Sequence, residues 1–337
     1  MSKMSVFIIA EAGVNHNGDI NLAKKLIDAA KDADVDAVKF QTFKTEKIVG
    51  RFAKKAEYQN ENTKTDESQF DMIKKLELSF DDFKELQEYC RQKGILFLST
   101  PDDEDSLDFL VSIKLPIIKV GSTEITNLQY LKKIAEKKIP IILSTGMSNL
   151  GEVERAVNTI YSSGNKKITL LHATTDYPTD YKDVNLNAMT TLRNAFKLPV
   201  GYSDHTLGIE AAVAAVALGA DVIEKHFTLD KGMEGPDHKA SLDPEELKEF
   251  VRAIRNTEAL LGNGIKEPTE REKKIIVNAR RSIVAAFDLK KGTLLEENMI
   301  TFKRPGNGIK PELSENIIGR KLNRDIKEDE LITWKDI

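Results

Sequence analysis

The chain has 337 residues, of which 40% are hydrophobic and 31% charged, and its formal net charge is −4. This length allows one large domain of about 250 residues and a smaller one. The balanced charge, without a cluster of Lys and Arg interleaved with aromatic residues, argues against nucleic acid as a partner.

The N-terminal sequence MSKMSVFIIAEAG has neither the long apolar run nor the small-residue cleavage site of a secretory signal. No later segment reaches the roughly 18 uninterrupted apolar residues of a membrane span. We therefore expect a cytoplasmic protein without a membrane partner. The single cysteine, Cys90, excludes a disulfide framework and a cysteine metal site.

Short apolar runs alternate with amphipathic helical patterns up to residue 262, which is typical of a parallel sheet covered by helices. Eight such units in about 260 residues predict a closed (β/α)8 TIM barrel rather than an open doubly wound sheet. GVNHNG, after the first strand, is not a dinucleotide-binding fingerprint. The predicted strands are 5–13, 36–42, 95–101, 116–122, 140–146, 168–174, 198–204 and 220–227.

The connection 43–78 is unusually long for a compact domain. Connections of this length are usually functional or disordered. Because this one follows the second strand of the barrel, it would lie over the barrel mouth, and we predict a partial lid.

The sequence pattern changes after the last helix predicted for the barrel, 244–262. We predict a barrel domain over 1–265, a linker over 266–279 and a small domain over 280–337, in which short strands are separated by Gly and Pro turns. A domain of this size gains little stability from its core alone. We therefore expect it to lean on the barrel or on a second subunit.

Polar side chains occur near the end of every predicted strand of the barrel. In a parallel barrel all strand C-termini lie at one face, which holds the active site in essentially all characterised barrel enzymes. We therefore expect these side chains to converge on one pocket. They are Glu11, Lys39, Gln41, Ser99, Thr100, Lys119, Ser122, Ser144, Thr145, His172, Ser203, Asp204, His205, Glu224, Lys225 and His226.

Two of these side chains, Lys39 and Lys119, would be lysines inside the barrel. An unpaired buried lysine carries a penalty of several kcal/mol, so each needs a carboxylate or a bound anion. With Ser122, Ser144 and Ser203 nearby, the two lysines are a plausible cradle for a phosphate or carboxylate group.

His205 and His226 end neighbouring strands, and Asp237 and His238 follow on the next loop. Two histidines with open positions for water and substrate suit a divalent metal such as Mn²⁺. The absence of cysteine from this set argues against structural zinc. His172, in contrast, is better interpreted as a hydrogen-bonded core residue.

Several segments resemble the sialic acid synthase family, in that family's order and over nearly the whole chain. They are IIAEAGVNHNGD, DAVKFQTFK, KVGSTEITNLQYL, IILSTGMSNLGE, GYSDHT, VIEKHFTLDKGMEGPDHKAS and KRPGNGI. The C-terminal segment resembles the family's antifreeze-like (SAF) domain. The resemblance implies condensation of phosphoenolpyruvate with an N-acylated mannose-type sugar, giving a nine-carbon 2-keto acid and phosphate by C–O cleavage.

The resemblance also implies roles for individual residues. It places Mn²⁺, with Mg²⁺ or Co²⁺ as alternatives, on His205 and His226. It implies phosphoenolpyruvate binding by Lys39, Lys119, Ser122, Ser144, Thr175 and Ser203. It implies sugar binding by Glu124, Tyr177, Asp237 and Arg304. The arginine would reach the site from the second subunit of a domain-swapped homodimer.

Glu11, Glu124 and Asp237 are the candidates for handling the proton of the attacking water, because enclosed carboxylates can be tuned for acid–base work. The sequence does not rank them. Lys39 joins them as a catalytic candidate, since a lysine can hold the charge of the leaving phosphate.

The chain departs from the family pattern at Thr123, at Asp102, where Phe is common, and at Ala173 with Thr175. Thr175 keeps a hydroxyl for a phosphate oxygen, so these departures bear on the choice of sugar. We favour N-acetylmannosamine, giving N-acetylneuraminate. The alternative is 2,4-diacetamido-2,4,6-trideoxymannose, giving legionaminic acid. A Schiff-base aldolase or a non-catalytic carbohydrate-binding protein is more remote.

Overall fold

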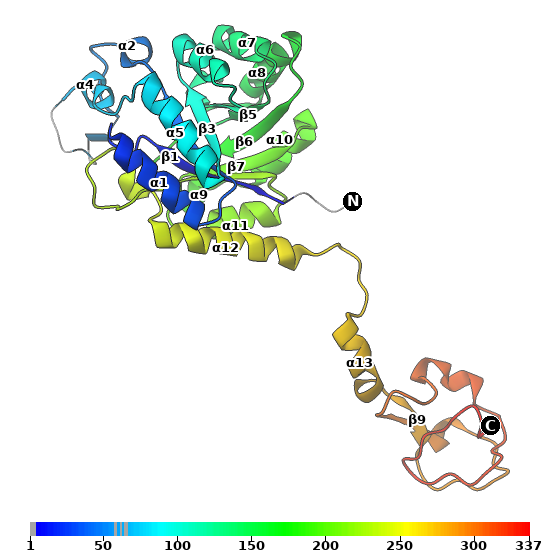
Figure 1. The fold of residues 1–337 in the computed structure, drawn as a ribbon. Helices are drawn as coiled ribbons and strands as arrows, with labels where there is room; N and C mark the ends of the chain where they lie inside the picture. The colour runs from blue at the N-terminus through cyan, green and yellow to red at the C-terminus, as the bar shows by residue number, and fades with distance from the viewer. Residues whose placement is uncertain (1–4, 57–58, 61–62, 64–66) are drawn as a thin grey trace. The chain divides into compact units, whose positions relative to one another are not determined.

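A computed structural model describes residues 5–56, 59–60, 63 and 67–337. Its first unit is a closed barrel of parallel strands in sequence order, with helices outside them (Figure 1). The predicted TIM barrel is therefore confirmed. The strands are β1 (Phe7–Gly13), β2 (Ala37–Thr42), β3 (Leu96–Pro101), β4 (Ile118–Val120), β5 (Ile141–Ser144), β6 (Ile168–Ala173), β7 (Val200–Asp204) and β8 (Val222–His226).

The helices of the barrel unit begin where the sequence supplies capping groups. Ser79 and Asp82 form a reciprocal capping box at the start of α5, and Asp243 caps α12 immediately before Pro244. The helices are α1 (Ile20–Asp32), α2 (Thr45–Ile48), α4 (Gln69–Lys74), α5 (Phe80–Lys93), α6 (Glu104–Ser112), α7 (Leu128–Glu136), α8 (Leu150–Ser162), α9 (Tyr181–Val184), α10 (Asn187–Phe196), α11 (Glu210–Ala217) and α12 (Pro244–Leu261).

The interior of the barrel has an apolar layer below a polar one. Because side chains alternate along a strand, a step of two residues stays on the same face of the sheet. The apolar layer is Ile9, Ala37, Leu98, Ile142, Leu171 and Val222. Two residues further along five of these strands lie Glu11, Lys39, Thr100, Ser144 and Glu224. The side chains inside the barrel thus change from apolar to polar or charged at about the same level on these five strands.

The long connection after β2 contains the short helices α2 and α4. Residues 57–58, 61–62 and 64–66, on which the predicted lid partly falls, lie outside the described residues. Of the described part, Lys47 and Ile48 line the pocket at the barrel mouth. The partial lid stays a prediction.

The second unit, residues 264–337, has its own core and a small antiparallel sheet. Its strands β9 (Ser282–Ala285) and β10 (Ile300–Lys303) pair with each other, and its core includes the buried residues Ile283, Ile317 and Ile332. The helix α13 (Glu270–Ala279) occupies most of the predicted linker and buries none of its residues.

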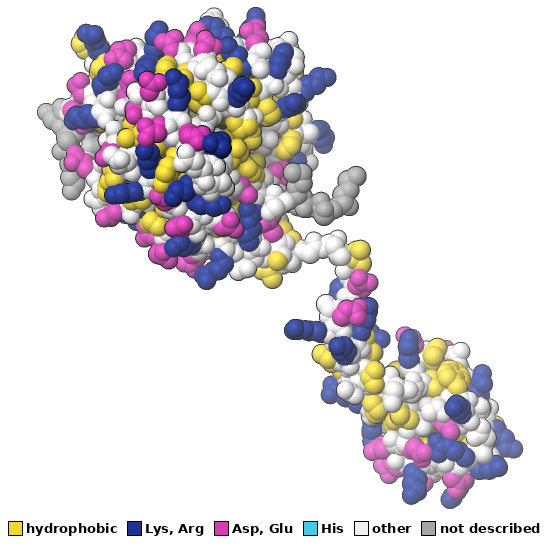
Figure 2. Space-filling model, viewed as in Figure 1, with side chains coloured by type: hydrophobic (Ala, Val, Ile, Leu, Met, Phe, Trp, Pro, Cys, Tyr) yellow, Lys and Arg dark blue, Asp and Glu magenta, His cyan; other side chains and the backbone are white. Residues whose placement is uncertain are grey.

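Charged side chains of both signs are interspersed over the face shown in Figure 2, on the barrel unit and on the second unit alike. This distribution fits the balanced composition. Among the helices that the structure describes, none combines the length and the apolar character needed to cross a membrane.

Candidate active site

A pocket of about 810 Å³ lies at the C-terminal ends of the barrel strands. Most of the residues predicted for the site line it, and they come from seven of the eight strands or the loops that follow them. They are Glu11, Lys39, Lys119, Ser122, Glu124, Ser144, Thr175, Tyr177, Ser203, His205, Glu224 and His226. Of the residues given individual roles above, Asp237 and Arg304 do not line this pocket: Asp237 lines a smaller adjoining cavity, and Arg304 belongs to the second unit.

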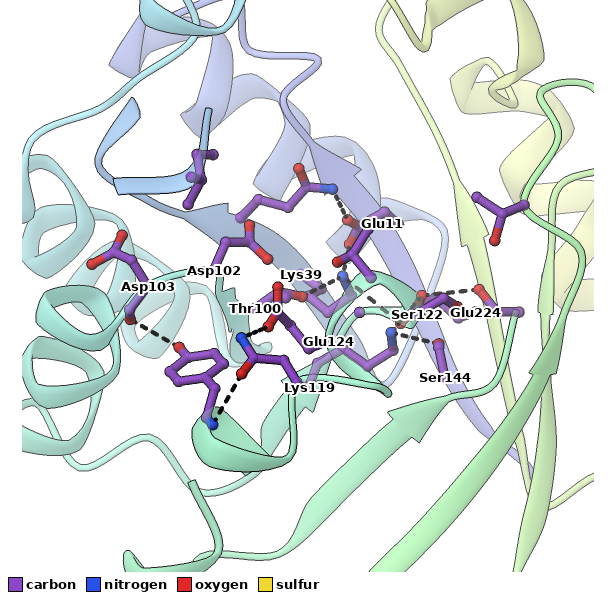
Figure 3. Close-up of a pocket in the computed structure, with 18 of the residues that line it drawn as sticks. Glu11, Lys39, Thr100, Asp102, Asp103, Lys119, Ser122, Glu124, Ser144 and Glu224 are labelled. Carbon is purple, nitrogen blue, oxygen red and sulfur yellow. Dashed lines mark hydrogen bonds and ion pairs between the residues drawn. The ribbon is translucent and has the colours of Figure 1, made fainter. Parts of the chain in front are cut away.

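Lys39 and Lys119 lie side by side at the bottom of the pocket, between two carboxylates (Figure 3). Lys39 Nζ is 2.6 Å from Glu11 Oε2 and 3.9 Å from Glu224 Oε2, and Lys119 Nζ is 3.5 Å from Glu224 Oε1. Lys39 also donates to Thr100 Oγ1 and Lys119 to Ser144 Oγ. The expected partners of the buried lysines are thus Glu11 and Glu224.

Glu224 also lies in this pocket, although no individual role was predicted for it. It is 5% exposed, approaches both lysines and accepts a hydrogen bond from Ser203 Oγ. Its place could have been found from the alternation along β8, which puts positions 224 and 226 on the same face.

The two carboxylates have opposite pKa shifts. Burial raises the pKa of Glu11 to about 7, although Lys39 opposes this shift. Burial would also raise the pKa of Glu224, but the charges of Lys119 and Lys39 hold it below its usual value. Glu11 can therefore exchange a proton near neutral pH, whereas Glu224 stays ionised.

Two hydroxyl groups meet at Gly146, in the loop after β5. Ser122 Oγ accepts a hydrogen bond from the amide of Gly146, and a side chain at this glycine would come 2.3 Å from Thr175 Oγ1 and 2.7 Å from Ser122 Oγ. Glycine thus leaves room for both hydroxyls at the rim of the lysine pair.

His205 and His226 face the same pocket, with ring centroids 5.6 Å apart, and Tyr177 packs against both rings. His205 Nδ1 donates to the carbonyl of Thr174, which leaves Nε2 with a free lone pair. Among the described residues, the buried His226 Nδ1 has no hydrogen-bond partner, and it lies 3.9 Å from Asp237 Oδ2. Burial lowers the pKa of both histidines, so both are neutral at pH 7.

Neutral imidazole is the form of histidine that binds a metal. Nδ1 of His226, which has no hydrogen-bond partner among the described residues, is available as a metal ligand. In the part of the chain that the structure describes, no three or more His, Cys, Asp or Glu side chains form a group able to hold a metal. A metal here would depend on the two histidines together with water and substrate.

The prediction that all polar strand ends converge on one pocket is wrong for the residues on the other face of the strands. His172 Nε2 donates to the Val184 carbonyl, and the ring stacks on Tyr202, as expected for a core residue. Lys225 and Asp204 pair with each other at 2.7 Å. Ser99 and Thr145 likewise hydrogen-bond to neighbouring strands rather than line the large pocket. The alternation of side chains is the physical reason.

The residues predicted to contact the sugar lie in different places: Glu124 and Tyr177 line the large pocket, and Asp237 lines the adjoining cavity. Glu124 accepts a hydrogen bond from Asn127 Nδ2, and burial raises the pKa of Asp237 to about 6. Arg304 is exposed at the end of β10 in the second unit.

Comparison with known proteins gives consistent matches for both units. Residues 26–266 match the sequence profile of the NeuB family, and residues 280–337 match that of the SAF domain. The N,N'-diacetyllegionaminic acid synthase of Campylobacter jejuni subsp. jejuni serotype O:2 is 55% identical, over 96% of this chain and 98% of the relative. The enzyme of the same name from Legionella pneumophila is 49% identical, over 100% of this chain and 96% of the relative.

Solved structures agree with these matches. The N-acetylneuraminic acid (sialic acid) synthetase of Leptospira borgpetersenii, crystallised with citrate, aligns with a TM-score of 0.71 at 37% identity. The alignment covers 81% of this chain and 90% of that chain.

Proposed function

The chain belongs to the NeuB family, whose members condense phosphoenolpyruvate with a sugar, and we propose that its sugar is 2,4-diacetamido-2,4,6-trideoxymannose. The product would be N,N'-diacetyllegionaminic acid. The observation that carries this proposal is the identity of 55% and 49% to two synthases named for that product, against 37% for the sialic acid synthetase. N-acetylmannosamine is the sugar expected from the sequence alone, and these identities favour its alternative, the diacetamido sugar.

We propose that the lysine pair binds phosphoenolpyruvate. Two ammonium groups at the bottom of an enclosed pocket stabilise a phosphate and a carboxylate without any covalent step. Ser122, Thr175 and Ser144 add hydroxyl donors around them. Lys119 is the better placed of the two lysines to bind a phosphate. Its nearest carboxylate, Glu224, is 3.5 Å away, whereas Lys39 is held by Glu11 at 2.6 Å.

In the proposed reaction, carbon 3 of phosphoenolpyruvate attacks the aldehyde carbon of the open-chain sugar and forms the new C–C bond. Carbon 2 becomes oxocarbenium-like, water adds to it, and the bond from carbon 2 to the phosphate oxygen breaks. A divalent ion on His205 and His226, Mn²⁺ with Mg²⁺ or Co²⁺ as alternatives, would supply Lewis-acid polarisation of the aldehyde. Glu11 would accept the proton of the water, because its pKa of about 7 suits general acid–base catalysis at neutral pH.

The test of the sugar is a comparison of kcat/KM for the two candidate sugars with the purified full chain, phosphoenolpyruvate and Mn²⁺. We expect phosphate release to be at least about tenfold more efficient with the diacetamido sugar, since a site built around one substituent discriminates by about 10- to 200-fold. Product mass identifies the nine-carbon acid, and reactions lacking either substrate are the controls.

A higher kcat/KM with N-acetylmannosamine would overturn the proposal. Borohydride reduction in the presence of pyruvate distinguishes the synthase from the aldolase alternative. An aldolase would be labelled at its Schiff-base lysine, whereas we expect this protein to stay unmodified.

We further propose the domain-swapped homodimer, in which Arg304 of each subunit serves the barrel of the other. Its exposure in the second unit leaves the guanidinium available for such a contact. The cytoplasmic location also stays a proposal.

Co-expression of Arg304→Ala and His226→Ala chains tests the swap. Each mixed dimer would hold one site with both substitutions and one with neither, so random assembly should restore about a quarter of the native activity. Lys303→Ala, on the preceding exposed residue, is the matched control. Mixed dimers that are present by mass but inactive would contradict the swap.

A further inference from the structure

A second cavity of about 180 Å³ adjoins the active-site pocket. The two share Gln41, Ile48, Asp102, Tyr177 and His226 in their walls. This side pocket therefore begins beside the histidine to which we assign the sugar's aldehyde end.

One part of the side-pocket wall is apolar, while Gln59 and Asp237 are among the polar residues that also line it. Val14, Phe43 and Leu76 form a small buried cluster, against which Ile48 and Ile73 pack. Four of these five residues come from the connection between β2 and α5, and Val14 follows β1. The long connection thus builds a hydrophobic recess at the barrel mouth.

Asp102 stands at the boundary of the two cavities, at the end of β3 and beside Glu11 and Lys39 (Figure 3). Within the described residues, its backbone amide donates to Thr42 O, but its carboxylate has no hydrogen-bond or ion-pair partner. Burial raises its pKa to about 7, with Lys39 opposing the shift. A half-buried carboxyl group with this shift is stabilised by a ligand that supplies a hydrogen-bond donor.

We propose that the side pocket is the subsite for the acetamido group on carbon 4 of the sugar, with Asp102 accepting a hydrogen bond from its N–H. This inference rests on the proposed function and extends it to a specificity residue. The methyl of the acetamido group lies against Phe43, Leu76 and Ile48.

The chemistry of the two candidate sugars supports this assignment. They share the acetamido group at carbon 2 but differ at carbon 4, where one has an acetamido group and the other a hydroxyl, and at carbon 6, where one has a methyl and the other a hydroxymethyl. An acetamido group carries an N–H donor, a carbonyl oxygen and a methyl; the N–H matches the acceptor of Asp102, and the methyl matches the apolar residues beside it. Hydroxyl groups placed against that recess would lose hydrogen bonds to water without replacement.

The experiment measures kcat/KM of the full-length enzyme for three sugars: the diacetamido sugar, its analogue with a hydroxyl at carbon 4, and N-acetylmannosamine. Asp102→Ala should lower kcat/KM for the diacetamido sugar about tenfold and by a smaller factor for the hydroxyl analogue, because a hydroxyl can rotate and donate to water instead. Asp102→Asn keeps an acceptor oxygen and should recover part of the loss. Asp108→Ala, which removes an exposed carboxylate of α6 paired with Lys137, is the control.

The outcomes separate the two proposals. If the native enzyme prefers N-acetylmannosamine, both the proposed sugar and the subsite are wrong. If it prefers the diacetamido sugar but Asp102→Ala reduces kcat/KM equally for the hydroxyl analogue, or for neither sugar, only the subsite is wrong.

Discussion

Replacing His226 with alanine should reduce kcat about a thousandfold, because Lewis-acid stabilisation of developing charge contributes several kcal/mol and each 1.36 kcal/mol is worth a factor of ten. The substitution would leave His205 as the single imidazole at the proposed metal position. The ring of His226, whose centroid lies 5.6 Å from that of His205, would be gone. A single histidine with water is a weak site for a divalent ion.

Binding of Mn²⁺ to the purified protein, followed by electron paramagnetic resonance, gives a readout independent of turnover and should be lost in His226→Ala. His172→Gln is the matched control, since His172 faces the helix layer and glutamine can keep the hydrogen bond to Val184 O. Both Mn²⁺ binding and turnover should persist in the control. Full activity of the native enzyme after exhaustive chelation would refute the metal assignment.

Replacing Lys225 with methionine should lower the free energy of unfolding of the barrel by about 3–5 kcal/mol. Lys225 Nζ donates to Asp204 Oδ2 and to the Thr206 carbonyl, both at 2.7 Å, and both side chains of the pair are almost wholly buried. Removing one partner would leave the Asp204 carboxylate buried with an uncompensated charge. Losing the Lys225 contacts with Asp204 and Thr206 would also loosen the turn between them, which positions His205.

Urea denaturation measures this effect. Far-UV circular dichroism follows the helices of the barrel, while the fluorescence of Trp334, the single tryptophan of the chain, follows the second unit. Lys231→Met removes a half-exposed ion pair with Glu246 and should cost less than about 1 kcal/mol. A loss for Lys225→Met no larger than for this control would show that the buried pair is not structural.

The strands of the barrel were predictable because each is a short apolar run bounded by helical patterns. The observed bounds differ from the predicted ones by one or two residues, as for β7, predicted at 198–204 and observed at Val200–Asp204. The position of the lysines and histidines followed from the same pattern, since a polar residue ending a buried strand of a parallel barrel reaches the mouth. These parts depend only on local sequence and the common direction of the strands.

The direction of each side chain was not recovered, although it obeys a simple rule. All three ionisable residues of VIEKHFT were predicted to reach the pocket. Glu224 and His226 do face it, whereas Lys225 faces the helices. The side pocket beside Asp102 could not be predicted. Its walls come from residues separated by more than 200 positions, such as Val14 and Pro236, and depend on how the loops pack.

The alternation along β7 and β8 makes these strands intolerant of insertions and deletions. Removing one residue before Glu224 would turn Lys225 into the barrel and Glu224 toward the helices, so that three ammonium groups would share the interior and a carboxylate would face Asp204 across the outer layer. Both changes place like charges together in buried space. Natural variation in length within this family should therefore be confined to loops such as the one between β2 and α5, where the recess can change size without shifting any catalytic strand.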